Sequence, residues 1–325
     1  MRSAQREALA VLAVLAVALP AAAQNATPPP PPSPTLAQVA PANNSEPDIA
    51  FGAFRRGRYL TALAEATKRA QQNDPVAMTM LGELYANGYG VGRDDSKAAQ
   101  WYKLAAAHGD RNAMFALAMF NIEGRAGPRN ETEGARLLDA AAKLGHPAAA
   151  YDLGLLYLQG KQFPQDFKHA AELFRQAADA GNAEAQYALA TMYKEGRGVA
   201  KDMGEAMKLM QQSAVAGDLD AMVEFAIAQF NGDDTAKDES AAAQLFLKAA
   251  RRGNAIAQDR LARILMAGRG MPADPAEAVK WHIVAKAAGD ADPELDAFAA
   301  KQPQSVRDAA DKAARKWMST LPPRS

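Results

Sequence analysis

Apolar and polar positions along the chain repeat every 36 residues between Asp74 and Gly289. Within each period, apolar residues recur at the spacing of one helix face in two separate stretches. A glycine follows the first stretch, and a second glycine closes the period. Self-similarity at a period of about 20–50 residues indicates stacked supersecondary units. The closing glycines are Gly109, Gly145, Gly181, Gly217, Gly253 and Gly289.

The first half of each unit predicts a helix, if positions are counted from the residue after the preceding closing glycine. Position 4 is always alanine, position 8 is leucine or phenylalanine, and position 9 is glycine or alanine. The small residue at position 9 predicts that another backbone approaches this helix closely. Position 15 is always glycine, which ends the helix because glycine adopts the left-handed conformation of a C-terminal cap. These glycines are Gly88, Gly124, Gly160, Gly196, Gly232 and Gly268.

The second half of each unit predicts a second helix, antiparallel to the first. Apolar residues at positions 25, 28, 29 and 32 form its buried face. Position 1 is Asp or Asn in five units and predicts the cap of the first helix, with His146 as the exception. Glu133, Glu205 and Glu277 follow a cap by three residues, which is typical of a capping box. The caps predicted for the second helices are Asp94, Asn130, Asp166, Asp202, Asp238 and Asp274.

The pattern from Ala77 to Gly109, A-x-x-x-L-G-x-x-Y-x-x-G-x-G-V-x-x-D-x-x-K-A-x-x-W-Y-x-x-A-A-x-x-G, resembles the Sel1-like repeat, a relative of the tetratricopeptide repeat. The resemblance implies an all-α, right-handed α/α superhelix (a solenoid) that binds proteins. Departures are local: Leu137 and Leu138 replace the aromatic pair in the second unit, and Asp234 replaces a loop glycine in the fifth.

The chain therefore divides into five expected parts. A signal peptide is followed by a proline-rich linker, a capping helix pair, six repeats, and capping helices with a tail. Their ranges are 1–23, 24–47, 48–73, 74–289 (units 1 to 6 being 74–109, 110–145, 146–181, 182–217, 218–253 and 254–289) and 290–325.

The first residues have the pattern of a secretory signal. Arg2 and Arg6 precede the apolar run 8–19, and small residues at 21–23 predict cleavage after Ala23. The run would extend about 18 Å as a helix, too short for a hydrocarbon core of about 30 Å. We expect a periplasmic or secreted protein with no membrane span in the mature chain; an uncleaved anchor is the alternative. The prolines at 28–34 predict an extended spacer, and a docking site for a proline-binding domain is the alternative.

Composition excludes several classes of function. The 325 residues include 37 basic and 37 acidic residues, without the basic excess that a nucleic-acid-binding face needs. The chain has no cysteine, which excludes a disulfide framework, a thiolate zinc site and a thiol nucleophile.

The sequence predicts no catalytic, cofactor-binding or metal-binding residue and no enzyme. His108, His146, His169 and His282 fall at different positions of the repeat, so no helix face gathers two of them. The glycines at 88–92 have the spacing of a dinucleotide loop, but no predicted strand precedes them. Met203, Met207 and Met210 share a helix face, and the repeat register favours core packing over a soft-metal site.

Protein binding is left as the expected activity. By analogy with tetratricopeptide repeats, positions 3, 6, 10 and 13 of the first helices line the concave side. Units 2, 3 and 5 are largely apolar there, whereas the outer units are more polar, with Thr79 and Glu83 in unit 1, Tyr187, Thr191 and Lys194 in unit 4, and Arg260 and Arg263 in unit 6. The alternative is that the apolar residues only pack neighbouring first helices together. The candidate binding residues are Phe115, Met119, Ile122, Tyr151, Leu155, Leu158, Tyr187, Val223, Ile227 and Phe230.

The expected function is an exported scaffold or regulator that holds a peptide or a partner domain in its concave groove. Because exported members of the resembled family include inhibitors of sensor kinases, the resemblance suggests the periplasmic domain of a membrane protein as partner. One alternative is a cell-wall or β-lactam-interacting protein with weak hydrolase activity; those relatives carry a disulfide in each repeat, and this chain has no cysteine. A structural spacer without a specific ligand is a third hypothesis.

Overall fold

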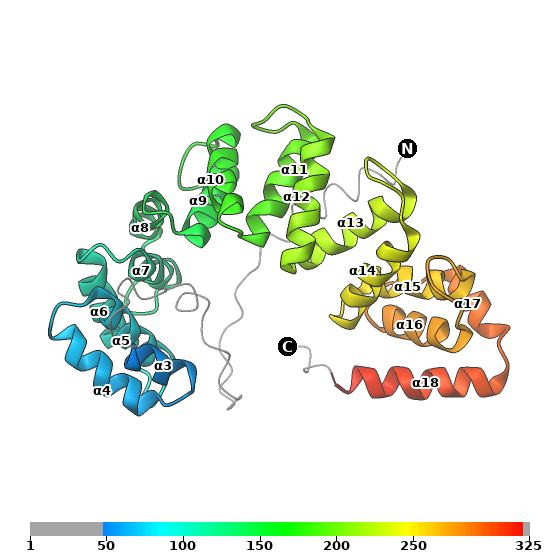
Figure 1. Cartoon of the computed structure of the whole chain (residues 1–325), viewed down its shortest axis with the longest axis horizontal. Coiled ribbons are helices and arrows are strands. Elements are labelled where there is room, and N and C mark those ends of the chain that lie inside the picture. The colour runs from blue at the N-terminus through cyan, green and yellow to red at the C-terminus, as the bar shows by residue number, and fades with distance from the viewer. Residues whose placement is uncertain (1–47, 321–325) are drawn as a thin grey trace. The chain divides into compact units, whose positions relative to one another are not determined.

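The computed structural model describes residues 48–320, so the expected signal peptide and proline-rich linker lie outside the described residues. Every regular element in that range is an α-helix (Figure 1). The helices are α3 (Ile49–Arg55), α4 (Tyr59–Ala70), α5 (Pro75–Asn87), α6 (Asp95–Ala107), α7 (Arg111–Glu123), α8 (Glu131–Lys143), α9 (Pro147–Gln159), α10 (Phe167–Asp179), α11 (Ala183–Glu195), α12 (Met203–Ala216), α13 (Leu219–Asn231), α14 (Glu239–Arg251), α15 (Ala255–Ala267), α16 (Pro275–Ala287), α17 (Pro293–Ala300) and α18 (Gln304–Met318).

The helices form consecutive pairs, one pair to each unit (Figure 1). Within a unit the first helix packs along the second, as α5 does along α6. The second helix then packs against the first helix of the next unit, as α6 does against α7, and this alternation continues to α16. Such contacts between neighbours along the chain define a solenoid. The predicted all-α solenoid of helix-turn-helix units is confirmed.

Eleven of the twelve helices α5 to α16 begin directly after the predicted cap residue. In unit 1, the Lys97 N–H donates to Oδ1 of Asp94 over 2.9 Å, which starts α6. His146, expected to be the exception, is also a cap, because its ring Nδ1 accepts the Ala149 N–H over 3.1 Å. A ring nitrogen therefore replaces the carboxylate or amide oxygen of the other units.

The turn between the two helices of a unit is closed by one recurring hydrogen bond. The backbone N–H of the second-helix cap donates to the carbonyl nine residues earlier, in the last turn of the first helix. Gly88, with φ of 70°, caps α5 in the left-handed conformation just inside this turn, and the other position-15 glycines do the same. The six bonds join Asp94 to Tyr85, Asn130 to Asn121, Asp166 to Tyr157, Asp202 to Tyr193, Asp238 to Gln229 and Asp274 to Leu265.

This closing bond explains why the capping-box prediction is wrong in its second half. A capping box needs the glutamate to accept the backbone N–H of the cap residue. That N–H is already donated to the preceding helix, and the glutamates turn outward to cations three residues later. The pairs are Glu133 with Arg136, Glu205 with Lys208, and Glu277 with Lys280.

Position 9 is a close contact between the two helices of a unit. A Cβ on Gly82 would lie 2.5 Å from the ring of Tyr102, and one on Gly154 would lie 2.6 Å from the ring of Phe174. Both rings are at position 29 and are fully buried. In unit 2 the same contact has an alanine, Ala118, and the smaller Leu138 is at position 29. The predicted approach of another backbone is therefore wrong in one respect, because the ring at position 29 fills the space left by the small residue.

The rest of the core is a set of alanine columns. Position 4 carries an alanine with at most 1% exposure in every unit, and position 32 carries a fully buried alanine or, in unit 4, Ser213. Alanine fills these columns because it combines the highest helix propensity with the smallest side chain that still packs. The Ser213 hydroxyl donates to the Ala183 carbonyl over 2.7 Å, so its polar group is satisfied.

A helix pair is present at each end of the six units. The pair α3 and α4 precedes α5 and packs against it, and Phe54 contacts Tyr59 edge to face at 5.7 Å between ring centroids. At the other end α18 packs against α16, and Trp281 contacts Trp317 at 5.4 Å. These pairs cover the core faces that terminal units would otherwise expose to water.

Arginines at position 16 of units 2, 4 and 6 connect each of these units to the one before it. The partner is position 22 of the preceding unit, at the start of its second helix. The pairs are Arg125 with Asp95, at 2.7 Å, Arg197 over the ring of Phe167, at 4.4 Å, and Arg269 with Glu239. Junctions 1–2, 3–4 and 5–6 therefore share an arginine contact, whereas at junction 2–3 position 22 is contacted by Gln162, which donates to Glu131.

The structure contains, over residues 48–320, no helix that combines the length and the apolar character needed to cross a membrane.

The close approach at position 9 generates a stability prediction. We expect Gly154→Ala to destabilise the fold by about 1–3 kcal/mol, because the new methyl group overlaps the fully buried Phe174 ring. Adding Phe174→Leu, which recreates the alanine–leucine pair of unit 2, should recover part of the loss. Urea unfolding midpoints measure both effects. The control is Gly204→Ala in α12, where a Cβ meets only Oδ1 of Asp202 at 3.4 Å and the helix should gain up to about 1 kcal/mol. Equal effects at the two glycines would contradict a steric cause.

The His146 cap generates a pH prediction. Burial, and then the nearby Arg111, lowers the pKa of His146 from 6.5 to about 4. The folded state thus binds fewer protons than the unfolded state, so this contribution to stability is complete above pH 6.5 and is lost as the pH falls through about 4. We expect His146→Asn, which keeps the cap as Asn182 does, to remove up to about 3 kcal/mol of acid sensitivity in this window. Urea unfolding at pH 4 and pH 7 tests this, with the exposed His108→Asn as control; an unchanged pH profile in His146→Asn would contradict it.

Candidate functional site

The ten candidate binding residues lie on four first helices, α7, α9, α11 and α13. Val223 is 4% exposed and belongs to the core, so a partner cannot contact it, and we remove it from the candidate set. The other nine are half-buried. All of these except Met119 also pack against the main core cluster. These side chains therefore combine packing between helices with a remaining exposed surface.

Thr79 and Glu83 in unit 1 correct the expectation of a polar inner side there. They are only 2% and 5% exposed. The Thr79 hydroxyl donates to the Pro75 carbonyl, and the Tyr102 hydroxyl donates to Oε2 of Glu83 over 2.9 Å. These two side chains thus form their hydrogen bonds within unit 1 and are closed to a partner. The partly exposed candidate residues begin on α7.

Several candidate residues are held by contacts to the next unit. Phe115 stacks on the ring of His146, with centroids 4.5 Å apart and an interplanar angle of 20°. The Tyr187 hydroxyl donates to Oε1 of Glu224 over 2.7 Å, and Lys194 lies 3.1 Å from Oε2 of the same carboxylate. Burial, and then Glu224, raises the pKa of Tyr187, which therefore acts as a hydroxyl donor at physiological pH.

Acidic side chains gather beside these tyrosines on α9, α11 and α13. Burial, and then the charge of Glu184, raises the pKa of Asp152 to about 7. Asp152 forms no hydrogen bond or ion pair with another residue of the described range. Burial also raises the pKa of Asp218, although the Ala221 N–H opposes this effect. The centre of the candidate surface therefore changes charge near neutral pH.

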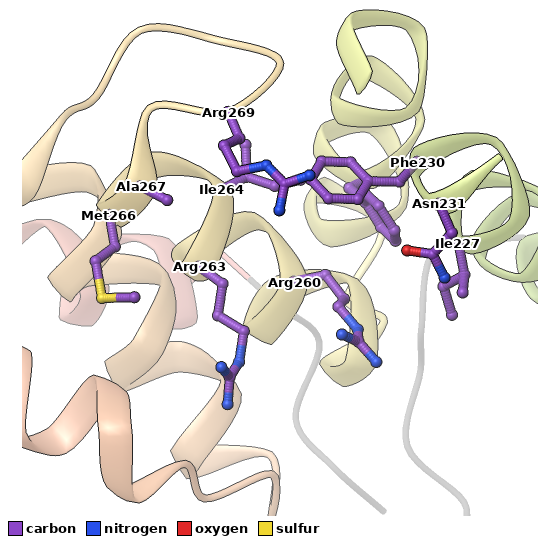
Figure 2. Close-up of a pocket in the computed structure, with 10 residues that line it drawn as sticks. Ile227, Phe230, Asn231, Arg260, Arg263, Ile264, Met266, Ala267 and Arg269 are labelled. Atoms are coloured by element: carbon purple, nitrogen blue, oxygen red, sulfur yellow. The ribbon is translucent and has the colours of Figure 1, made fainter. Parts of the chain in front are cut away.

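A cavity of about 340 Å³ opens between α13 and α15, at the junction of units 5 and 6 (Figure 2). Its apolar lining includes two of the candidate residues. Arg260, Arg263, Arg269 and Asn231 supply its polar groups, and no carboxylate lines it. The apolar side chains are Ile227, Phe230, Phe246, Ile264, Met266 and Ala267.

Two of the three arginines at this cavity are neutralised. Arg263 forms ion pairs with Asp259, Asp292 and Glu294. Arg269 pairs with Glu239, and its guanidinium carbon lies 4.6 Å from the ring centroid of Phe230.

Arg260 differs from both. It is exposed, and no residue between 48 and 320 gives it a hydrogen bond or an ion pair. In Figure 2 its guanidinium lies in the space between α15 and α13, on the side of Ile227 and Asn231. The sequence indicated that Arg260 and Arg263 make the inner side of unit 6 more polar, but it did not show that they share a cavity with Phe230.

The residues considered for catalysis or metal binding stay apart. His169 pairs with Glu172, His282 with Asp296, and His146 is a helix cap. Within the part of the chain that the structure describes, no three His, Asp or Glu side chains come together to hold a metal ion. Met210 is fully buried in the core, whereas Met203 and Met207 are half-buried. The glycine-rich segment 88–92 is the turn after α5.

Asp152 generates a second pH prediction, opposite in sign to that of His146. A carboxyl with a raised pKa contributes stability that is complete below the unfolded value of 3.8 and is lost as the pH rises through about 7. We expect Asp152→Asn to raise the free energy of unfolding by about 2 kcal/mol at pH 8 and to leave it unchanged at pH 4. Urea unfolding at the two pH values measures this. Asp179→Asn, at an exposed site on α10, is the control, and a gain that is equal at both pH values would exclude titration as the cause.

Comparison with known proteins identifies the repeat. The family model of the Sel1 repeat matches residues 75–110, 111–146, 147–182, 183–218, 219–254 and 255–290. Each match begins one residue after the unit boundary that we inferred from the closing glycines. No curated protein matches the chain.

Two solved structures resemble this one along most of its length. A Sel1 repeat protein from Oxalobacter formigenes is 29% identical, with a TM-score of 0.66 over 74% of this chain and 98% of that one. A protective antigen of uropathogenic Escherichia coli, described as displaying an SLR fold, is 25% identical, with a TM-score of 0.54 over 85% of this chain and 71% of that one. With six matched repeats and these two relatives, the chain belongs to the Sel1 repeat family.

Proposed function

We propose that this protein is a non-enzymatic interaction scaffold that binds a peptide or a partner domain along its first helices. One observation carries the proposal: half-exposed apolar or aromatic side chains occupy positions 6, 10 and 13 of α7 and α9, and they continue at position 6 of α11 and at positions 10 and 13 of α13. On α7 these are Phe115, Met119 and Ile122, which share one helix face because they are spaced by four and then three residues. Sel1 repeats are in general modules of protein–protein interaction, which supports the same function.

The chemistry of this surface suits a protein partner. Aromatic and methionine side chains are enriched in the cores of interfaces, where they bury large apolar areas. Phe115, Tyr151 and Met119 provide such groups, and the carboxylates beside Tyr151 and Tyr187 provide a polar surround. The side chains are also held in place by the next unit, as Phe115 is by His146, so little side-chain entropy is lost when a partner binds.

Export is part of the proposal. The apolar run 8–19 and the small residues at 21–23 support a signal peptide and therefore a periplasmic or secreted protein. The partner that we favour is the periplasmic domain of a membrane protein such as a sensor kinase. The hydrolase alternative receives no support from the described residues, and steady turnover of a chromogenic β-lactam or of peptidoglycan by the purified protein would contradict a pure scaffold.

The surface generates a binding prediction. Met119→Glu and Leu155→Glu each place a charge among the candidate binding residues of α7 and α9. We expect each substitution to weaken partner capture by about tenfold or more. The measurement is an affinity pull-down from a periplasmic extract, with the mature protein as bait and the captured partner quantified by mass spectrometry. The same spectra read the N-terminus of the bait, which is Gln24 if cleavage follows Ala23.

The matched controls place the same charge on second helices. Leu104 on α6 and Val215 on α12 are 49% and 76% exposed. Leu104→Glu and Val215→Glu should leave capture unchanged. Circular dichroism and the thermal midpoint show whether each variant remains folded. Capture that survives both inner substitutions in folded protein would contradict a binding surface on the first helices.

A further inference from the structure

The cavity between α13 and α15 carries a more specific inference, which rests on the proposed scaffold function. We propose that it receives the C-terminal residue of a partner polypeptide. The apolar side chain of that residue enters the cavity, and its α-carboxylate binds Arg260. Size, charge and sequence position each support this occupant.

The size of the cavity fits a small group. Pockets for small ligands are typically about 300–1,000 Å³. At about 340 Å³, this one lies at the lower end of that range and suits a side chain with its adjoining backbone rather than a folded element. Its walls include Ile227, Phe230 and Ile264, so an apolar side chain is favoured by removal from water.

The charges at the cavity leave one position for an anion. Arg263 and Arg269 are occupied by four carboxylates of this chain, whereas Arg260 is free and exposed. A guanidinium binds a carboxylate through two parallel N–H donors, which is the strongest pairing available to it. No carboxylate lines the cavity itself. The carboxylates that contact its lining residues are paired with Arg263 and Arg269 or, in Asp233, accept from Asn231, so none of them is paired with Arg260. A group that is both apolar and singly anionic matches this arrangement.

A polypeptide C-terminus has this combination, since its carboxylate and its side chain are attached to the same carbon. Asn231 lies across the cavity from Arg260 (Figure 2). The Asn231 amide nitrogen donates to Asp233 over 2.9 Å, and its amide oxygen is left to accept the backbone N–H of a bound peptide. Two contacts, to the carboxylate and to the N–H, would orient the last residue with its side chain toward Phe230.

Arg260 is not required by the repeat itself. It occupies position 7 of unit 6, and no other unit has a basic residue there. Helix pairing therefore does not depend on a cation at this position, and the arginine is explained better by a ligand. The residues at position 7 of units 1 to 5 are Met80, Ala116, Asp152, Ala188 and Glu224.

The test begins with a library of peptides that have free C-termini and five randomised terminal residues, selected on the full chain. We expect enrichment of Leu, Ile, Val, Met or Phe at the last position. The best selected peptide is then titrated by fluorescence polarisation as the free acid and as the C-terminal amide. The amide should bind at least about tenfold more weakly, which is the loss expected for one charge-assisted pair.

Variants of the protein assign the carboxylate to its partner. Arg260→Gln should weaken the free acid by a similar factor and should abolish the difference between acid and amide. Arg251→Gln removes the same charge from an exposed site at the end of α14 and should change neither affinity.

Four results would overturn the inference. They are a selection without preference at the last position, equal binding of acid and amide, an Arg260→Gln variant that still distinguishes them, and binding of decanoate that is tighter than that of the peptide. If one of these results is found and Met119→Glu still weakens partner capture, the C-terminus site is wrong and the scaffold function is retained. If Met119→Glu also leaves partner capture unchanged, both the C-terminus site and the scaffold function are wrong.

Discussion

The arrangement at the turn within each unit is the constraint on which the rest of the structure depends. One residue, at position 21, uses its side chain to cap the second helix and its backbone N–H to hold the end of the first. The side chain accepts an N–H from the first turn of the second helix, and the backbone N–H donates to a carbonyl in the last turn of the first helix. Neither of these helix-end groups has a partner within its own helix. The same bond recurs in all six units. The turn therefore joins the two helices of every unit in the same register, and the same repeat positions meet between them.

This constraint determines where the units can vary. Positions 4, 9 and 32 face the partner helix at short distance and carry only Ala, Gly or Ser, and the contact of Gly154 with Phe174 shows the reason at position 9. Positions 6, 7, 10 and 13 of the first helices do not form the close contact between the two helices of a unit. They carry Phe115 in one unit, Asp152 in another and Arg260 in a third. The half-exposed apolar surface, the titrating carboxyl and the arginine-lined cavity all lie at these variable positions.

The helices, their caps and the solenoid could be predicted from the sequence because their causes are local and repeated six times. Features that depend on a neighbouring unit could not. Val223 and Ile227 both occupy predicted inner positions, but the packing around them buries one and leaves the other half-exposed. The cavity needs side chains from α13 and α15 together. His146 lacked the usual cap chemistry, and only the orientation of its ring shows that Nδ1 accepts the N–H of Ala149.

The arginines at position 16 have a consequence for how such an array changes in length. Arg125, Arg197 and Arg269 each require a partner in the preceding unit, and they occur in alternate units. Deleting unit 1, 3 or 5 alone would remove the partner of the arginine in the following unit. Duplicating or deleting units 1–2, 3–4 or 5–6 as a block would keep every pair intact. At these three junctions two neighbouring repeats therefore form one contact block, although the helix pair itself repeats with every unit.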